Sequence, residues 1–196
     1  MKQYFEENDA LPMDEVKVGL QKFGHDFVFM TRKGLFSVGE VDKVSLILIE
    51  NIPKISGKLL DLGCGYGAVG IILSKIYDVA LFGCDINKHA VEMAKKNAAL
   101  NNVEASYFVS DSFSQVEGTF DAIVLNPPIH AGKETVFGMF REAKKHLAQK
   151  GAFYLVIQKK HGAKTVVGEL NKIYESCSTL YKKKGVFVLE CRTGGN

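Results

Sequence analysis

Apolar and polar residues alternate near the start of the chain. Val16, Val18 and Leu20 occupy every second position, and a second apolar run at residues 27–30 follows Gly24. Alternation of period two is typical of a strand with one buried face, and a glycine between two such runs marks a turn. We therefore expect residues 1–33 to carry a β-hairpin that precedes a larger domain formed by residues 34–196.

The centre of the chain repeats strand-like and helix-like segments. Apolar positions from Val41 onward recur at helical spacing until Pro53, which predicts a short helix. The strands predicted after it are residues 58–62, 79–84, 105–109, 120–125 and 152–157, and the helices are residues 68–76, 88–100, 133–148 and 162–174. Strands that alternate with helices at this spacing indicate a parallel sheet with helices on both faces, so the predicted fold class is α/β.

The last two apolar segments depart from this alternation. Residues 177–181 and 186–191 are separated by a turn containing Lys-Lys-Lys-Gly. Strands joined by so short a turn pair in the antiparallel direction. An antiparallel hairpin is therefore predicted at one edge of the sheet.

Composition favours a single core without a membrane segment. Of the 196 residues, 46% are apolar, which is enough for one substantial core. The apolar runs are far shorter than a membrane span and Met1 precedes acidic and polar residues, so a cytoplasmic protein is expected. The sequence predicts neither a disulfide nor a metal site, because the histidines lack ligand spacing and no CxxC pair occurs among Cys64, Cys84, Cys177 and Cys191.

Positive charge is concentrated at the end of the chain. Residues 141–196 contain twelve Lys or Arg and four Asp or Glu, a net charge of +8, whereas the first 140 residues carry −5. Such asymmetry is typical of a surface that meets phosphate groups, and equally typical of a solvated basic face.

A glycine-rich loop joins the first strand of the repeat to the next helix. Its sequence is Asp61-Leu62-Gly63-Cys64-Gly65-Tyr66-Gly67. Glycines let a backbone turn sharply and approach a ligand, and parallel sheets bind ligands at this edge. The GxGxG spacing differs from the GxGxxG of dinucleotide sites, and a carboxylate at Asp61 would repel a pyrophosphate. It can pair with the cationic methionine end of S-adenosylmethionine, which is the predicted cofactor.

Further carboxylates follow the next two strands. Asp85 lies 24 residues after Asp61, where it can accept hydrogen bonds from both ribose hydroxyls while Ile86 lies against the adenine. Asp111, followed by Ser112, can face the adenine amino group. The alternative for Asp111 is a helix N-cap.

A stiff loop, Asn126-Pro127-Pro128-Ile129, follows the fourth strand at the same edge. Prolines fix the backbone and lack N–H donors, so the loop presents acceptors. An amino group conjugated to a base or amide is planar and a poor nucleophile. The Asn126 side-chain oxygen and the Pro127 carbonyl can accept its two N–H bonds and aim the nitrogen at the cofactor methyl group. Such positioning can supply roughly 7 to 11 kcal/mol of a barrier, so these four residues are the predicted catalytic loop.

These motifs carry a family resemblance. The sequences DLGCGYG and NPPIHAGKE, together with the strand-ending Asp85, resemble the small-domain class I methyltransferases, and more narrowly the ribosomal RNA guanine-N2 methyltransferases of the small ribosomal subunit. Gly34-Leu35-Phe36-Ser37, followed by Val41-Asp42, is similar to the GxFS element of that family, which lies over the cofactor and acceptor. The resemblance covers about residues 34–160.

The resemblance implies a Rossmann-like sheet of seven strands with a reversed last strand. It also implies S-adenosylmethionine-dependent methylation of an exocyclic amino group of an RNA base, with guanine N2 of ribosomal RNA as the leading acceptor. Two features depart from the family: Ile129 stands where an aromatic residue is frequent, and bacterial members carry an additional N-terminal domain. Substrate contacts are predicted for Phe36, His130, Lys159 and Lys160.

Two other functions are compatible with these motifs. Methylation of a protein glutamine amide would use the same loop, because that nitrogen is also planar. A non-catalytic RNA-binding or assembly factor could retain the fold without turnover. Either a monomer or a homodimer agrees with the sequence.

Overall fold

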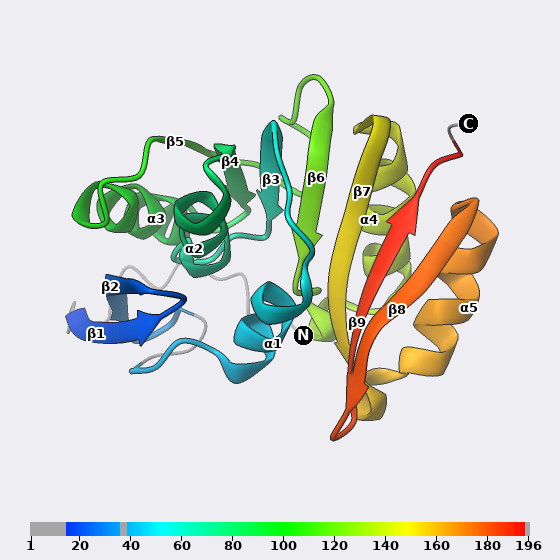
Figure 1. Ribbon diagram of the computed structural model, residues 1–196, viewed down its shortest axis with the longest axis horizontal. Coiled ribbons are helices and arrows are strands. Elements are labelled where there is room, and N and C mark those ends of the chain that lie inside the picture. Colours follow the sequence, from blue (N-terminus) through cyan, green and yellow to red (C-terminus); the bar gives the residue numbers. More distant parts are fainter. Residues whose placement is uncertain (1–14, 36–38, 195–196) are drawn as a thin grey trace.

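One seven-stranded sheet forms the centre of the molecule (Figure 1). The computed structural model describes residues 15–35 and 39–194. The strand order is β5-β4-β3-β6-β7-β9-β8, and β9 runs in the direction opposite to the other six strands. The strands are β3 (Lys58–Leu62), β4 (Ala80–Asp85), β5 (Ala105–Val109), β6 (Phe120–Leu125), β7 (Leu147–Gln158), β8 (Ser176–Lys183) and β9 (Val186–Arg192). The predicted α/β class, mostly parallel sheet and C-terminal hairpin are confirmed.

Helices cover both faces of this sheet. Successive strand residues point to opposite faces, and accordingly Leu59 and Val124 belong to one apolar cluster whereas Leu60 and Ile123 belong to another. The first cluster includes residues of α1 (Lys43–Asn51), α2 (Ala68–Tyr77) and α3 (Lys88–Leu100), and the second those of α4 (Lys133–Lys145) and α5 (Ala163–Ile173). None of the helices described is both long and apolar enough to cross a membrane.

The helix predicted over residues 133–148 is three residues shorter. It ends at Lys145, and Leu147 already begins β7, where it pairs with Phe120 and is buried. The His146 ring stacks on Phe113 at a centroid distance of 4.8 Å. The sequence pattern predicted a longer helix because Leu147 is apolar and continues the helical spacing. It packs into the same core as α4, but from the strand β7.

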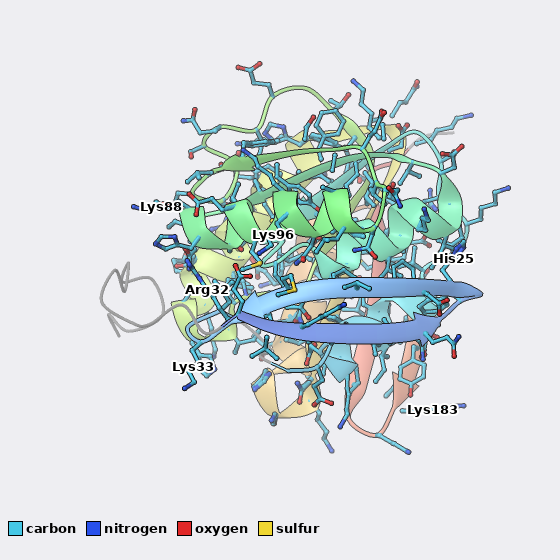
Figure 2. All side chains as sticks on the ribbon, turned by 90° about the vertical axis from the view of Figure 1, so that its left-hand side faces the viewer. His25, Arg32, Lys33, Lys88, Lys96 and Lys183 are labelled. Carbon is cyan, nitrogen blue, oxygen red and sulfur yellow. A yellow bond between two sulfur atoms is a disulfide. The ribbon has the colours of Figure 1, made fainter. Side chains whose placement is uncertain are left out.

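The N-terminal hairpin packs against α3 (Figure 2). Its strands are β1 (Glu15–Lys22) and β2 (His25–Arg32). The Asn97 side chain accepts from Met30 N at 2.7 Å and donates to Met30 O at 2.9 Å, and Asn101 bonds Val28 in the same way at 3.0 and 2.8 Å. Side chains four apart on a helix share a face, so these two amides satisfy the edge of β2 in place of another strand.

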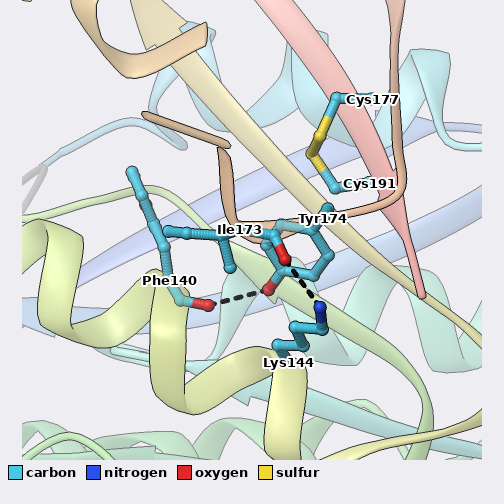
Figure 3. The surroundings of a disulfide bond; sticks show 6 residues. All are labelled: Phe140, Lys144, Ile173, Tyr174, Cys177 and Cys191. Atoms are coloured by element: carbon cyan, nitrogen blue, oxygen red, sulfur yellow. Dashed lines mark hydrogen bonds between the residues drawn. A yellow bond between two sulfur atoms is a disulfide. The ribbon is translucent and has the colours of Figure 1, made fainter. Parts of the chain in front are cut away.

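Cys177 and Cys191 form a disulfide bond (Figure 3), so the prediction of no disulfide was wrong. The two residues are 14 positions apart, but the hairpin register places them opposite each other on β8 and β9, with Cα atoms 4.2 Å apart. A search for CxxC spacing cannot find such a pair, because the pairing depends on where the turn lies. Nearby, Tyr174 Oη donates to Phe140 O at 2.9 Å and ties the end of α5 to α4.

Candidate active site

A cavity of about 510 Å³ lies at the carboxyl edge of the sheet. Its walls come from the loops after β3, β4, β5 and β6 and from the segment leading into α1. The chain connections diverge between β3 and β6, and open α/β sheets bind ligands at such a switch point. The predicted residues that line it are Asp61, Gly63, Gly65, Tyr66, Asp85, Ile86, Asp111, Ser112, Asn126, Pro127 and Pro128.

The three glycines of the loop have two different tasks. Gly63 and Gly65 have φ of +68° and +54°, line the cavity, and would meet no atom within 4 Å if they carried a Cβ. Gly67 is not among the cavity-lining residues. Its φ is +88°, and a Cβ there would lie 2.9 Å from Tyr107 Oη and 3.1 Å from Ala94 Cβ. The first two glycines thus offer open backbone to a ligand, while Gly67 allows close packing.

Asp85 is anchored to the glycine loop. One carboxylate oxygen accepts from Gly65 N at 2.9 Å and the other accepts from Asn87 N at 2.9 Å. Because a carboxylate has about four acceptor positions, each oxygen can accept one more hydrogen bond, from a pair of ribose hydroxyls. Burial raises the pKa of Asp85. Beside it, Ile86 is 42% exposed, an apolar surface that an adenine ring can cover.

Asp61 lies beneath the glycine loop. It is 3% exposed and accepts from Gly70 N at 2.8 Å. Burial raises its pKa to about 7, and the charge of Asp85 acts in the same direction. A cationic ligand group in the cavity would favour the ionised form. The donor set and the open glycine backbone therefore fit the cationic, ribose-containing cofactor predicted from the sequence.

The N-cap interpretation of Asp111 is wrong. Residues 110–119, between β5 and β6, form turns and contain no helix. Asp111 is exposed and lines the cavity together with Ser112. Its contact with the adenine stays a prediction.

The side chain of Asn126 has a fixed orientation. Its amide nitrogen Nδ2 donates to Ser45 Oγ at 3.1 Å and to Asp42 Oδ2 at 3.4 Å. A carboxylate can only accept hydrogen bonds, so the NH₂ group must face Asp42. The amide oxygen of Asn126 is therefore left as an acceptor for a ligand.

A second cavity of about 270 Å³ shares the catalytic loop with the first. Asp42, Asn126, Pro127 and Pro128 line both, and Ile129 lines only the second. The rest of its wall comes from Val44 of α1, from His130 on the 3-10 turn η1 (Ile129–Ala131), and from the end of β7 and the turn after it, with Val156, Ile157, Gln158 and His161. The loop thus forms a wall that the larger and the smaller cavity share.

Of the other residues predicted to contact the substrate, two lie beside the second cavity and one is not described. Lys159 and Lys160 are exposed on the 3-10 turn η2 (Lys159–His161), next to Gln158 of the second cavity. Phe36 lies outside the described residues. Ser45 was missed as a site residue, and Asp42 was noted only as the end of the element similar to GxFS, although an Asp at the start of a predicted helix was a visible N-cap signal. Among described residues, no group of three His, Cys, Asp or Glu could hold a metal ion.

Fold and site together define a class I methyltransferase. The family model for the methyltransferase small domain matches residues 26–190, so the chain belongs to this family. The chain is 34% identical over 195 residues to the uncharacterized protein YbxB of Bacillus subtilis, covering 96% of this chain and 97% of that protein. It is 38% identical over 129 residues to ribosomal RNA small subunit methyltransferase C of Haemophilus influenzae, covering 63% of this chain and 39% of that protein.

Solved structures agree with this assignment. The Thermus thermophilus 16S rRNA N2 G1207 methyltransferase, in complex with AdoMet and guanosine, has a TM-score of 0.81 and 26% identity, covering 96% of this chain and 53% of that chain. A Pyrococcus furiosus methyltransferase with 23% identity and a TM-score of 0.66 shares the fold. The predictions of methyltransferase class and of S-adenosylmethionine as cofactor are confirmed. The chain spans about two fifths of the length of the Haemophilus relative.

Proposed function

We propose that the protein transfers the methyl group of S-adenosylmethionine to an exocyclic amino group of an RNA base, with guanine N2 of ribosomal RNA as the leading acceptor. The observation that carries this proposal is the oriented amide of Asn126 in the wall shared by the two cavities. Support for RNA comes from the relatives named as ribosomal RNA methyltransferases. A cytoplasmic location follows from such a substrate.

The residues of the site act mainly by positioning. The acceptor base enters the smaller cavity, where Ile129 and Pro128 provide an apolar wall. The Asn126 amide oxygen and the Pro127 carbonyl accept the two N–H bonds of the amino group and direct its lone pair toward the larger cavity. The bound cofactor supplies an electrophilic methyl group there. No strong base is required at the nitrogen, because its proton can leave after transfer.

Asn126→Ala tests the role of this amide. We expect the methylation rate at saturating cofactor to fall about 10²- to 10³-fold, the range seen when one preorganised polar group is removed from an active site. The affinity for S-adenosylhomocysteine, measured by calorimetry, stays within about threefold of the wild type. Methyl transfer is followed with labelled cofactor on small-subunit ribosomal RNA, and the product is identified by nucleoside analysis.

A matched control is Thr135→Ala, which removes a polar group that also lines the larger cavity but whose hydroxyl bonds Ala131 O at 3.1 Å. It should retain most of the methylation rate. Unchanged methylation by Asn126→Ala would refute the role of the amide. Methyl groups found on a protein glutamine, with none on RNA, would refute the proposed acceptor.

A further inference from the structure

Six exposed lysines gather at the edge of the sheet that carries the site. Lys159 and Lys160 lie on η2, Lys164 lies at the start of α5, and Lys182, Lys183 and Lys184 lie at the β8–β9 turn. We call these six residues the lysine cluster. Although they come from two stretches about 20 residues apart, the fold brings them together.

The sheet topology explains this gathering. Since β9 is antiparallel to both β7 and β8, β8 runs parallel to β7 and ends at the same edge (Figure 1). Lys159 N donates to Gly185 O at 2.7 Å, so η2 and the β8–β9 turn are in direct contact. Figure 2 shows Lys183 at the projecting end of this hairpin.

The carboxylates of this part of the chain pair elsewhere. The four Glu residues after position 140 form ion pairs with Arg141, Lys144, Lys145, Lys172 and Arg192. Within residues 15–35 and 39–194, no ion pair involves a member of the lysine cluster. The excess positive charge of the C-terminal stretch is therefore concentrated at one place.

The lysine cluster adjoins the smaller cavity. Gln158 and His161, on either side of Lys159 and Lys160, line that cavity. Burial lowers the pKa of His161, and the positive charges of Lys160 and His130 act in the same direction. A nucleotide whose base occupies the cavity would place its neighbouring phosphates at this edge.

We infer that the lysine cluster binds the sugar-phosphate backbone of the acceptor RNA beside the base that enters the smaller cavity. This inference rests on the proposed function and adds the surface by which the RNA is held. Lysines bind phosphates as point charges without sequence readout. The cluster would therefore set affinity and orientation, while the cavity sets which base reacts.

The test compares two triple variants with the same change of charge. Lys182→Gln/Lys183→Gln/Lys184→Gln alters the cluster. Lys145→Gln/Lys150→Gln/Lys172→Gln removes three exposed lysines near the opposite ends of α4, β7 and α5. The probe is a 30-nucleotide single-stranded RNA of mixed sequence, and its dissociation constant is measured by fluorescence anisotropy over a series of salt concentrations.

Loss of three phosphate contacts should reduce the slope of log affinity against log salt by about 2 and weaken binding at low salt more than tenfold. The control variant should change the affinity less than threefold. Equal weakening by both variants, or an unchanged slope in the cluster variant, would overturn the inference. It would also be overturned if a polyglutamate peptide competed with the RNA as well as unlabelled RNA does.

Methylation assays separate this inference from the proposed function. If the wild type methylates RNA and the cluster variant does so with an unchanged KM for RNA, only the docking surface is refuted. If the wild type binds S-adenosylhomocysteine but transfers no methyl group to RNA, the proposed function itself fails. Affinity for S-adenosylhomocysteine should be the same in both triple variants and the wild type.

Discussion

The active-site cavity has two walls that are held in place by different means. We call the wall that carries Asp61 and Asp85 the cofactor wall, and the wall that carries Asn126 the acceptor wall. On the cofactor wall, Asp61 and Asp85 accept hydrogen bonds from backbone N–H groups 2 to 20 residues away. On the acceptor wall, Asn126 is oriented by the side chains of Asp42 and Ser45, 84 and 81 residues away. The first wall is therefore built locally within the β3-α2-β4 unit, whereas the second depends on how α1 packs against the end of β6.

A second carboxylate placed opposite Asp42 on the acceptor wall should have the largest effect on the methylation rate. Asn126→Asp places two carboxylates face to face where the amide nitrogen now lies 3.4 Å from Asp42. Repulsion removes the defined orientation, and we expect the methylation rate to fall at least 10²-fold, as for loss of a preorganised polar group. The double variant Asp42→Asn/Asn126→Asp restores a donor facing an acceptor, and should regain at least tenfold over the single variant.

The helix cap does not confound this comparison. Asp42 also caps α1 by accepting from Ser45 N at 2.7 Å, and Asn is an equally good N-cap. Single-turnover rates at saturating cofactor measure the coupling between the two positions. A double variant no faster than Asn126→Asp would contradict the positioning role of Asp42. Affinity for S-adenosylhomocysteine should change much less than the rate, since these substitutions leave Asp61 and Asp85 untouched.

On the cofactor wall, Asp85→Ala should weaken the binding of the cofactor. The variant would lose the two hydrogen bonds that the ribose hydroxyls are predicted to donate to this carboxylate, each contributing about 1.5 to 3 kcal/mol, so cofactor binding should weaken about 10²-fold or more. Asp111→Ala, an exposed carboxylate on the same wall, should weaken it less than tenfold. Calorimetry with S-adenosylhomocysteine measures both, and thermal unfolding without ligand controls for the fold. Equal losses in the two variants would contradict the ribose assignment to Asp85.

The same contrast explains what could be predicted from the sequence. Asp61 and Asp85 lie at the carboxyl ends of the buried strands β3 and β4, and the glycine loop follows β3 directly, so their common edge was predictable from strand order along the chain. Asp42 was noted only as the end of the element similar to GxFS, and neither it nor Ser45 could be tied to Asn126, because this contact depends on packing across more than 80 residues.

Long-range register limits prediction elsewhere too. Both strands of the C-terminal hairpin were predicted, yet the pairing of Cys177 with Cys191 was not. The apolar run at residues 27–30 predicted the second strand of the N-terminal hairpin. The amides of Asn97 and Asn101 that dock this strand give no periodic signal.

Within the cofactor wall, a pair of glycine substitutions separates packing from binding. Gly67→Ala keeps a positive φ with a Cβ 2.9 Å from Tyr107 Oη, so we expect a loss of about 2 kcal/mol or more in the free energy of unfolding. Gly63→Ala meets no neighbour and should cost only about 1 kcal/mol for its φ of +68°. Its methyl group lies at the cavity surface, so cofactor affinity should fall about tenfold. Urea unfolding and calorimetry measure the two quantities, and the reverse ranking would mean that Gly63 serves packing rather than ligand approach.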